Sequence, residues 1–99
     1  MKNFAASIVL ASYNGESFIF EQLKSILIQM ELNDELIIID DCSTDNSIIL
    51  IKQIFEKYNR LNTFLFSNKE NLGPKKSFEE GLKKASKDII VLSDQDDIW

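Results

Sequence analysis

The chain has no histidine, one cysteine, one proline and only three glycines in 99 residues. Without histidine it cannot form a Ser-His-Asp or Cys-His catalytic set, nor a histidine metal site. The single cysteine, Cys42, excludes an internal disulfide and a multi-thiolate zinc site, and it fits a reduced, cytosolic setting. No base or metal partner in the sequence activates its thiol, so we expect Cys42 to be a small residue in a packed turn.

Net positive charge and long hydrophobic runs are also lacking. The formal net charge is −5, and because nonspecific nucleic-acid binding requires a basic surface, we expect no nucleic-acid partner. Apolar runs in the core segments reach only four residues, whereas a membrane span needs roughly 20. Apolar residues make up 44% of the chain, which is the composition of one globular domain.

Short apolar runs alternate with segments of helical periodicity. We expect strands over residues 7–11, 36–39, 63–66 and 89–92. Gaps of three and four between apolar residues predict a helix after each of the first three strands. The expected inward-facing residues are Ile19, Leu23, Ile26, Leu27 and Met30 in the first helix, Ile48, Ile51, Ile54, Phe55 and Tyr58 in the second, and Phe78, Leu82 and Ala85 in the third.

Turn and capping residues mark where these helices begin. Residues 14–15, Asn-Gly, end the first strand, and the first helix is expected from about residue 17. Residues 43–45 supply candidate N-caps for the second helix. Pro74 can begin the third, because the first helical position needs no N–H. The alternation predicts an α/β fold, a Rossmann-like three-layer sandwich with a mostly parallel sheet.

Polar and acidic residues follow three of the four expected strands. They are Ser12-Tyr13-Asn14, Asp40-Asp41 and Asp94-Gln95-Asp96-Asp97. The last group follows a four-residue apolar run, which predicts a strand buried on both faces. Open α/β sheets bind ligands at the carboxyl ends of their strands, so the three groups can converge on one crevice. Two carboxylates ~4 Å apart repel by about 4 kcal/mol at a partly buried site, so bunched acids there favour a bound cation.

Four segments together resemble the nucleotide-binding half of the inverting family-2 glycosyltransferases with the GT-A fold. They read SIVLASYNG (residues 7–15), IIIDDCSTD (37–45), NLG (71–73) and SDQDD (93–97), and the resemblance covers nearly the whole chain. Residues 93–99 are most similar to the bacterial rhamnosyltransferase-like branch, whose members build cell-surface polysaccharide and O-antigen chains. The resemblance implies a partial GT-A fold with strand order 3-2-1-4.

The resemblance also implies a role for individual residues. It assigns donor binding to Ala11, Tyr13, Asp41 and Asp94, and metal binding to Asp96. Tyr13 would stack on the base, and Asp41 would accept a hydrogen bond from N3–H of uracil or thymine. Asp94 would approach the ribose, while Asp96 would hold Mg²⁺ or Mn²⁺, which carboxylate oxygens suit. The plainer alternatives are a half-buried tyrosine, acids that favour a helix N-terminus, and a solvated acidic turn.

Other polar residues near these motifs receive structural expectations. Asp40 is expected to steady its loop, and Asp45 to serve the N-terminus of the second helix. Residues 71–73 are expected to shape the loop near the pocket. Lys75 and Lys76 could approach phosphates or form a solvated basic turn. Two positions depart from the family pattern: Ala11 stands where many members carry threonine or proline, and residues 79–81, Glu-Glu-Gly, replace a frequent Asn-x-Gly.

The resemblance leads to a functional expectation for a longer parent protein. It would be a metal-dependent glycosyltransferase that moves a sugar from a UDP- or dTDP-sugar to a hydroxyl of a saccharide acceptor, with inversion. The catalytic base and acceptor site of the family follow the metal motif. Residues 1–99 would therefore be the nucleotide-diphosphate-sugar-binding half of a truncated domain, inactive alone and prone to self-association. The expected location is cytoplasmic, with the parent at most peripheral to the inner face of the membrane.

Two other classes of protein also place acids at strand ends. A non-enzymatic, receiver-like module binds Mg²⁺, but its acid pair normally follows the first strand, where this chain has residues 12–14, Ser-Tyr-Asn. A nucleotidyltransferase usually has a glycine-rich, basic loop there, and this chain has one glycine, Gly15. Both classes therefore fit the sequence less well than the glycosyltransferase family.

Overall fold

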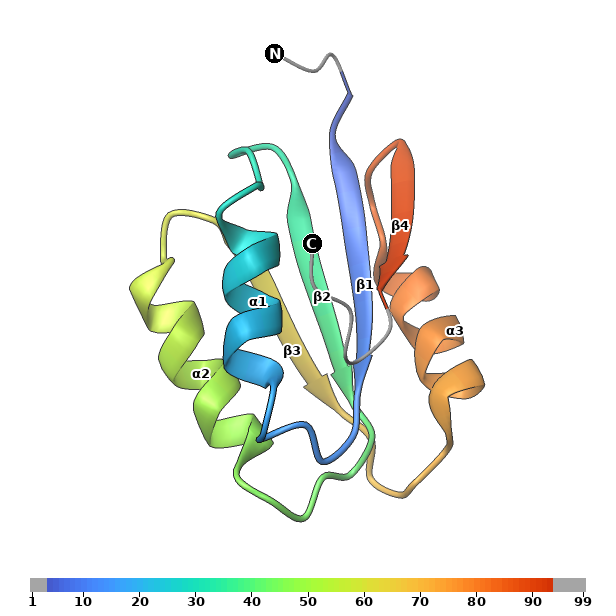
Figure 1. Cartoon of the computed structure of the whole chain (residues 1–99). Helices are drawn as coiled ribbons and strands as arrows, with labels where there is room; N and C mark the ends of the chain where they lie inside the picture. Colours follow the sequence, from blue (N-terminus) through green and yellow to red (C-terminus); the bar gives the residue numbers. More distant parts are fainter. Residues whose placement is uncertain (1–3, 94–99) are drawn as a thin grey trace.

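The computed structural model describes residues 4–93 of the chain, which form a four-stranded sheet and three helices. The elements, in chain order, are β1 (Ala6–Ser12), α1 (Ile19–Leu27), β2 (Glu35–Asp40), α2 (Ser47–Lys57), β3 (Asn62–Ser67), α3 (Pro74–Lys84) and β4 (Ile89–Ser93). All strand pairs are parallel, in the order β3-β2-β1-β4. Helices α1 and α2 lie on one face of the sheet and α3 on the other (Figure 1). The predicted three-layer α/β sandwich and strand order are confirmed.

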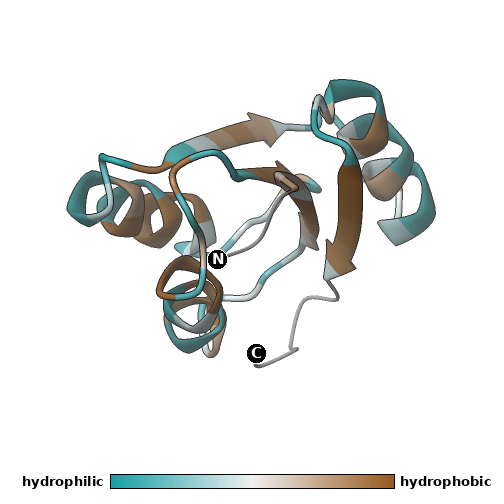
Figure 2. Ribbon diagram, turned by 90° about the horizontal axis from the view of Figure 1, so that it is seen from above, coloured by the Kyte–Doolittle hydropathy of each residue, from teal (hydrophilic) through white to brown (hydrophobic). Residues whose placement is uncertain are grey.

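The main core lies between the sheet and the layer formed by α1 and α2. Strands β1 and β2 are buried along almost their whole length, because each has a strand on both sides and helices on both faces. Figure 2 shows the apolar residues of the sheet and helices turned toward one another between the layers. The buried members of this core are Ile8, Leu10, Ile19, Leu23, Ile26, Leu27, Leu36, Ile38, Ile51 and Ile54. The predicted inward faces of the first two helices are therefore correct except at Ile48, which is not part of this core, whereas Leu50 packs against it.

The predicted buried stripe of the third helix is wrong. Leu82 is 40% exposed, Phe78 and Ala85 are only half-buried, and the buried residues of α3 are Ser77 and Gly81. Helix α3 lies so close to the sheet that a Cβ on Gly81 would overlap the Val9 Cγ1 atom. It can therefore present only small residues to the sheet. The large apolar residues that helical spacing singles out therefore flank the contact instead of making it.

Strand β4 is more exposed than its four-residue apolar run predicts. Ile89, Ile90 and Leu92 are 43%, 46% and 53% exposed, although Val91 packs against the core. Within residues 4–93, β4 is one of the two edge strands, and α3 packs mainly against β1 and β2. Its sequence therefore predicts the strand correctly and the two-sided burial incorrectly.

The helix starts agree only partly with the predicted caps. Pro74 is the first residue of α3, as expected, and it follows Gly73, whose φ of 89° lies in the region that favours glycine. Helix α1 begins at Ile19, two residues later than expected, and α2 begins after its N-cap residue Asn46, whose side chain makes no capping hydrogen bond. Residues 43–45 are thus not the N-cap of α2. No helix within residues 4–93 has the length and apolar character that a membrane crossing requires.

Candidate functional site

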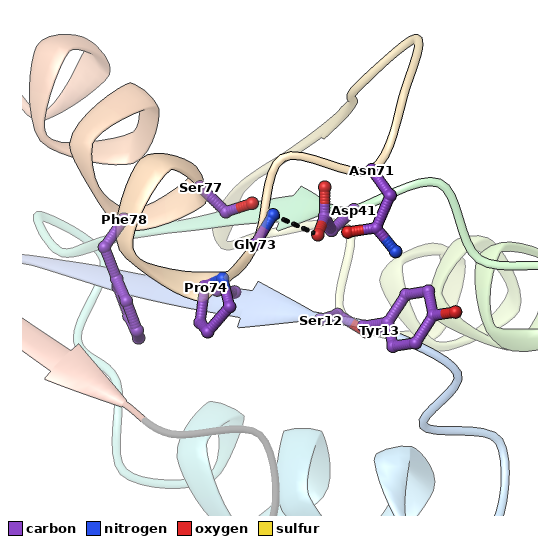
Figure 3. Close-up of a pocket in the computed structure, with 9 residues that line it drawn as sticks. Ser12, Tyr13, Asp41, Asn71, Gly73, Pro74, Ser77 and Phe78 are labelled. Carbon is purple, nitrogen blue, oxygen red and sulfur yellow. Dashed lines mark hydrogen bonds between the residues drawn. The ribbon is translucent and has the colours of Figure 1, made fainter.

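A pocket of about 370 Å³ opens at the carboxyl ends of β1 and β2, beside the start of α3. Its lining comes from β1 and the following loop, from the residue after β2, and from the segment around the α3 N-terminus (Figure 3). The lining residues are Ala11, Ser12, Tyr13, Asp41, Asn71, Gly73, Pro74, Ser77 and Phe78. The sequence-predicted Ala11, Tyr13 and Asp41 therefore share one pocket. Asp94 and Asp96 lie outside the described residues.

Of the described residues that line this pocket, Asp41 is the only one with a carboxylate, and it is 4% exposed. Its Oδ1 accepts hydrogen bonds from the backbone N–H of Leu72, at 2.7 Å, and from Nδ2 of Asn68, at 2.9 Å. Its Oδ2 accepts one from the backbone N–H of Gly73, at 2.8 Å. Burial alone would raise the pKa of Asp41, but these hydrogen bonds outweigh it and lower the pKa below its ordinary value. The carboxylate is therefore ionised at neutral pH.

The hydrogen bonds to Asp41 leave it a limited capacity for a ligand. A carboxylate oxygen accepts about two hydrogen bonds in favourable positions. Within residues 4–93, Oδ1 already accepts two and Oδ2 accepts one. The arrangement leaves one acceptor position, on Oδ2, so Asp41 can receive one further N–H or O–H donor.

Asn68 is a residue of this site that the sequence analysis missed. It follows β3 directly, and its Nδ2 donates to Asp41 Oδ1 and, at 3.0 Å, to the Ser77 hydroxyl. Its backbone N–H donates to the carbonyl of Asp40 at 2.8 Å. The rule that singled out polar residues at the ends of the other strands applies equally to β3, and it would have found Asn68.

Tyr13 and Ala11 provide the apolar surface of the β1 side. The Tyr13 side chain is 44% exposed and lies at the edge of the pocket, near Asp41 and Asn71 in Figure 3. Ala11 is half-buried and contributes only a methyl group. An exposed aromatic face beside a buried, ionised carboxylate can bind a planar ring that carries a hydrogen-bond donor.

The loop after β2 is held by its own acids. Asp40 accepts hydrogen bonds from the backbone N–H of Ser43, at 2.9 Å, and from the Ser43 hydroxyl, at 2.6 Å, which confirms that it steadies this loop. Asp45 accepts from both the N–H and the hydroxyl of Ser47 at the start of α2, as its expected role requires. Cys42 is exposed and has a φ of 62°, so the prediction that it lies in a packed turn is wrong.

The described part of the chain does not contain the predicted metal site. Within residues 4–93 no group of three His, Cys, Asp or Glu residues could hold a metal ion. Three N–H donors already point at the Asp41 carboxylate, and the acceptor position that they leave can receive a further hydrogen-bond donor. Lys75 and Lys76 are exposed on the first turn of α3 and do not line the pocket.

Two buried acids at the opposite end of the sheet were not singled out from the sequence. Glu35 accepts hydrogen bonds from the Ser7 hydroxyl, at 2.6 Å, and from the N–H and hydroxyl of Ser86, at 2.7 Å and 3.0 Å. Lys87 N–H donates in turn to the Ser7 hydroxyl at 3.0 Å. Burial raises the pKa of Glu35, yet the hydrogen bonds from Ser7 and Ser86 lower it overall. Asp34 likewise accepts from the N–H groups of Ala6 and Glu31, both at 2.9 Å.

The fold and the pocket together define an α/β domain with a pocket at the carboxyl edge of a parallel sheet, the edge at which open sheets of this kind bind ligands. Residues 7–99 match the model of Glycosyl transferase family 2, and the chain belongs to that family. The receiver-like and nucleotidyltransferase alternatives are accordingly not favoured.

Comparison with individual proteins supports the same family. The chain is 39% identical over 93 residues to dTDP-rhamnosyl transferase RfbG of Shigella flexneri, covering 91% of this chain and 32% of that protein. It is 34% identical to S. aureus TarS 1-349 in complex with UDP-GlcNAc, with a TM-score of 0.79 over 92% of this chain and 26% of TarS 1-349. The chain spans about a third of the length of RfbG and as little as 15% of the length of other curated relatives it matches.

A further solved structure supports the fold alone. The mannosyltransferase PcManGT from Pyrobaculum calidifontis, in complex with GDP-Man and Mn²⁺, has a TM-score of 0.93 over 100% of this chain and 29% of its own chain, at 23% identity. The expected partial GT-A fold is therefore confirmed.

Proposed function

We propose that residues 1–99 are the donor-binding half of a glycosyltransferase domain, truncated after the metal motif, and that the pocket beside α3 binds a nucleoside-diphosphate sugar. The observation that carries the proposal is the buried, ionised Asp41 carboxylate, with one acceptor position left, beside the exposed ring of Tyr13. The names of two relatives support it, since RfbG is a dTDP-rhamnosyl transferase and TarS was solved with UDP-GlcNAc.

The hydrogen bonds to Asp41 favour a pyrimidine base in the donor. Uracil and thymine each present a single N3–H donor, whereas guanine presents adjacent N1–H and N2–H donors that need two acceptors. Asp41 has one acceptor position left, on Oδ2, because Asn68 and Leu72 both donate to Oδ1. We therefore infer that the donor is a UDP- or dTDP-sugar.

Tyr13 and Ala11 complete the proposed base site. Stacking of a base on an aromatic ring contributes about 1–3 kcal/mol and tolerates different bases, so Tyr13 would add affinity without selecting the base. Ala11 would leave room for the ring of the base, because it presents only a methyl group to the pocket. Asp41 would then supply the selectivity.

The rest of the donor site is assigned by the family resemblance. Asp94 would contact the ribose, and Asp96 would hold Mn²⁺ or Mg²⁺. A divalent cation bound there would neutralise negative charge on the departing nucleoside diphosphate. The longer parent protein would transfer the sugar, with inversion, to a hydroxyl of a saccharide acceptor. Its proposed location is the cytoplasm, peripheral to the inner face of the membrane, and no residue of this chain is assigned as the catalytic base.

Calorimetric titration of the chain with UDP, dTDP and GDP, with and without Mn²⁺, tests this proposal. We expect UDP or dTDP to bind in the presence of Mn²⁺. Asp41→Asn replaces one acceptor oxygen with a donor and should weaken binding by about tenfold or more. Asp88→Asn removes the same charge from an exposed position and should bind UDP as the unsubstituted chain does. Equal UDP affinity in Asp41→Asn and the unsubstituted chain would contradict the assignment of Asp41.

The metal assignment is tested in the same titrations. Asp96→Asn should weaken the Mn²⁺-dependent part of UDP binding by about tenfold or more, the usual scale for perturbing a metal site. UDP binding by the unsubstituted chain that is the same with and without Mn²⁺ would contradict metal dependence. Full Mn²⁺ dependence in Asp96→Asn would contradict the choice of that residue.

A further inference from the structure

The loops that follow β1 and β2 are joined by three successive backbone amides of the first loop. Asn14 N–H donates to the Ser43 hydroxyl at 2.9 Å, and Gly15 N–H donates to the Ser47 hydroxyl at 2.9 Å. Glu16 N–H donates to Oδ2 of Asp45 at 3.1 Å. Each acceptor is a side chain of the second loop or of the first residue of α2. The path of the first loop is therefore set by the second.

Asn14 also holds the second loop in return. Its side-chain Oδ1 accepts a hydrogen bond from the backbone N–H of Thr44 at 2.8 Å, and longer ones from the Thr44 hydroxyl and from Asp45 N–H, both at 3.4 Å. Asn14 is thus a donor to the second loop through its backbone and an acceptor from it through its side chain. None of the motif roles assigned above uses this side chain.

Backbone strain lies next to the two proposed base-binding residues. Within residues 4–93, the non-glycine residues with positive φ are Asn14, at 48°, and Cys42, at 62°. Asn14 directly follows Tyr13, and Cys42 directly follows Asp41. Left-handed backbone is unfavourable for most side chains and persists where the surroundings impose it, although asparagine tolerates it better than most. The hydrogen bonds between the loops supply that constraint.

We propose that Asn14 is a positioning residue of the nucleotide site, which holds the Tyr13 ring in place against Asp41 without itself contacting the ligand. This inference rests on the proposed function. Loss of the Asn14 side-chain oxygen leaves the Thr44 amide without its partner and loosens the first loop from the second. Tyr13 then samples positions from which it cannot stack on a base held by Asp41.

The variant Asn14→Gly tests the proposal without adding strain, because glycine adopts a φ of 48° readily and removes the side-chain amide with its oxygen. UDP affinity is measured in the presence of Mn²⁺ by titration, well below the melting temperature of every variant. We expect the affinity to fall about five- to tenfold, the scale of one lost hydrogen bond that orders a site. The control is Asn62→Ala, since the Asn62 side chain also holds a loop, in this case by donating from Nδ2 to the carbonyls of Leu32 and Asp34 at the opposite end of the sheet. Asn62→Ala should lower the melting temperature and leave UDP affinity unchanged.

A double-mutant cycle with Tyr13→Ala separates positioning from a general loss of stability. If Asn14 acts through Tyr13, Asn14→Gly should change UDP affinity less than about twofold once the ring is absent. An equal loss of affinity in both backgrounds, or no loss in the parent background, would overturn the inference while leaving the proposed function intact. If the parent chain binds neither UDP nor dTDP, the proposed function fails, and this inference fails with it.

Discussion

Gly81 of α3 lies directly against Val9 of β1, so closely that a Cβ built on Gly81 would overlap the Val9 Cγ1 atom. The contact is between the middle of the helix and a strand residue that is fully buried. It sets how near α3 can approach the sheet. Because α3 begins at the pocket, this contact also sets the distance between the pocket wall formed by Pro74 and Ser77 and the end of β1.

Gly81→Ala should therefore destabilise the chain, by about 1–3 kcal/mol, the usual cost of overpacking a core. Thermal unfolding followed by circular dichroism measures the effect, with Leu82→Ala on the exposed side of α3 as the control. The double variant Val9→Ala/Gly81→Ala should recover part of the loss, because it removes the atom with which the new methyl group collides. No difference between Gly81→Ala and Leu82→Ala would show that α3 can shift outward at no cost.

Asn68→Ala should relax the choice of base. The substitution frees one acceptor position on Asp41 Oδ1, so the carboxylate could receive both guanine donors. We expect the ratio of UDP to GDP affinity to fall by about tenfold, the scale of one hydrogen bond to a charged group. Ser77→Ala removes the other acceptor of Asn68 Nδ2 while Oδ1 stays occupied, so it should leave the ratio unchanged. A ratio that is the same in Asn68→Ala and the parent would contradict the proposed selection of pyrimidines.

Acid should unfold the chain in part by protonating Glu35. Its pKa in the folded state lies below the ordinary value of 4.5, so the unfolded chain binds the proton more tightly. The stabilisation from Glu35 is thus complete above about pH 4.5 and is lost as the pH falls through the folded-state pKa. Glu35→Gln should lower the free energy of unfolding at pH 7 by about 1–3 kcal/mol and reduce its loss toward acid pH. Urea denaturation at several pH values measures both effects.

The control for Glu35 is Glu79→Gln, which removes the same charge from an exposed position on α3. Its free energy of unfolding should change with pH as that of the unsubstituted chain does. Asp41 and Asp45 also have lowered pKa values from hydrogen bonds that outweigh burial, so some dependence on pH should remain in Glu35→Gln. If that variant keeps the full acid dependence of the parent, Glu35 is not one of its sources.

The exposed apolar residues of β4 should make the chain self-associate. Ile90 and Leu92 lie on one face of an outer strand of the described sheet and Ile89 on the other, so apolar side chains are exposed on both sides of this edge, and such edges recruit partners. Ile90→Lys should reduce association in sedimentation experiments over a concentration series. Ile49→Lys alters an exposed residue of α2, away from this edge, and should not. A parent chain that is monomeric at all concentrations would contradict this expectation.

The sequence pattern was sufficient to predict the strands and most residues of the α1–α2 layer, while the strand order 3-2-1-4 came from the family resemblance. The core between the sheet and these two helices is filled by large side chains that recur at the helical period, among them Leu23, Ile26 and Ile51. The face of α3 could not be predicted in this way. Gly81 carries no hydrophobic signal, and its meaning depends on how near Val9 lies across the sheet.

The site was predictable where it coincided with strand ends and unpredictable where it depended on partners distant in the sequence. Tyr13 and Asp41 follow buried strands, and that pattern is enough to bring them together. The three hydrogen bonds that lower the Asp41 pKa come from residues 27–32 positions away, and no local pattern encodes them. The left-handed conformation of Cys42 is likewise a product of the folded loop, since cysteine has no preference for it.

The edge position and exposure of β4 bear on the order in which the strands of this sheet should unfold. Strand β4 is paired with β1 along one edge, its side chains are poorly covered, and its entry is fastened by Ser86 and Lys87 to Glu35 and Ser7. Strands β1 and β2 have pairing on both sides and helices on both faces. Opening should therefore begin at the edge strands, β4 and β3, and spread inward, so that their amide protons exchange with solvent through local fluctuations while those of β1 and β2 exchange only on global unfolding.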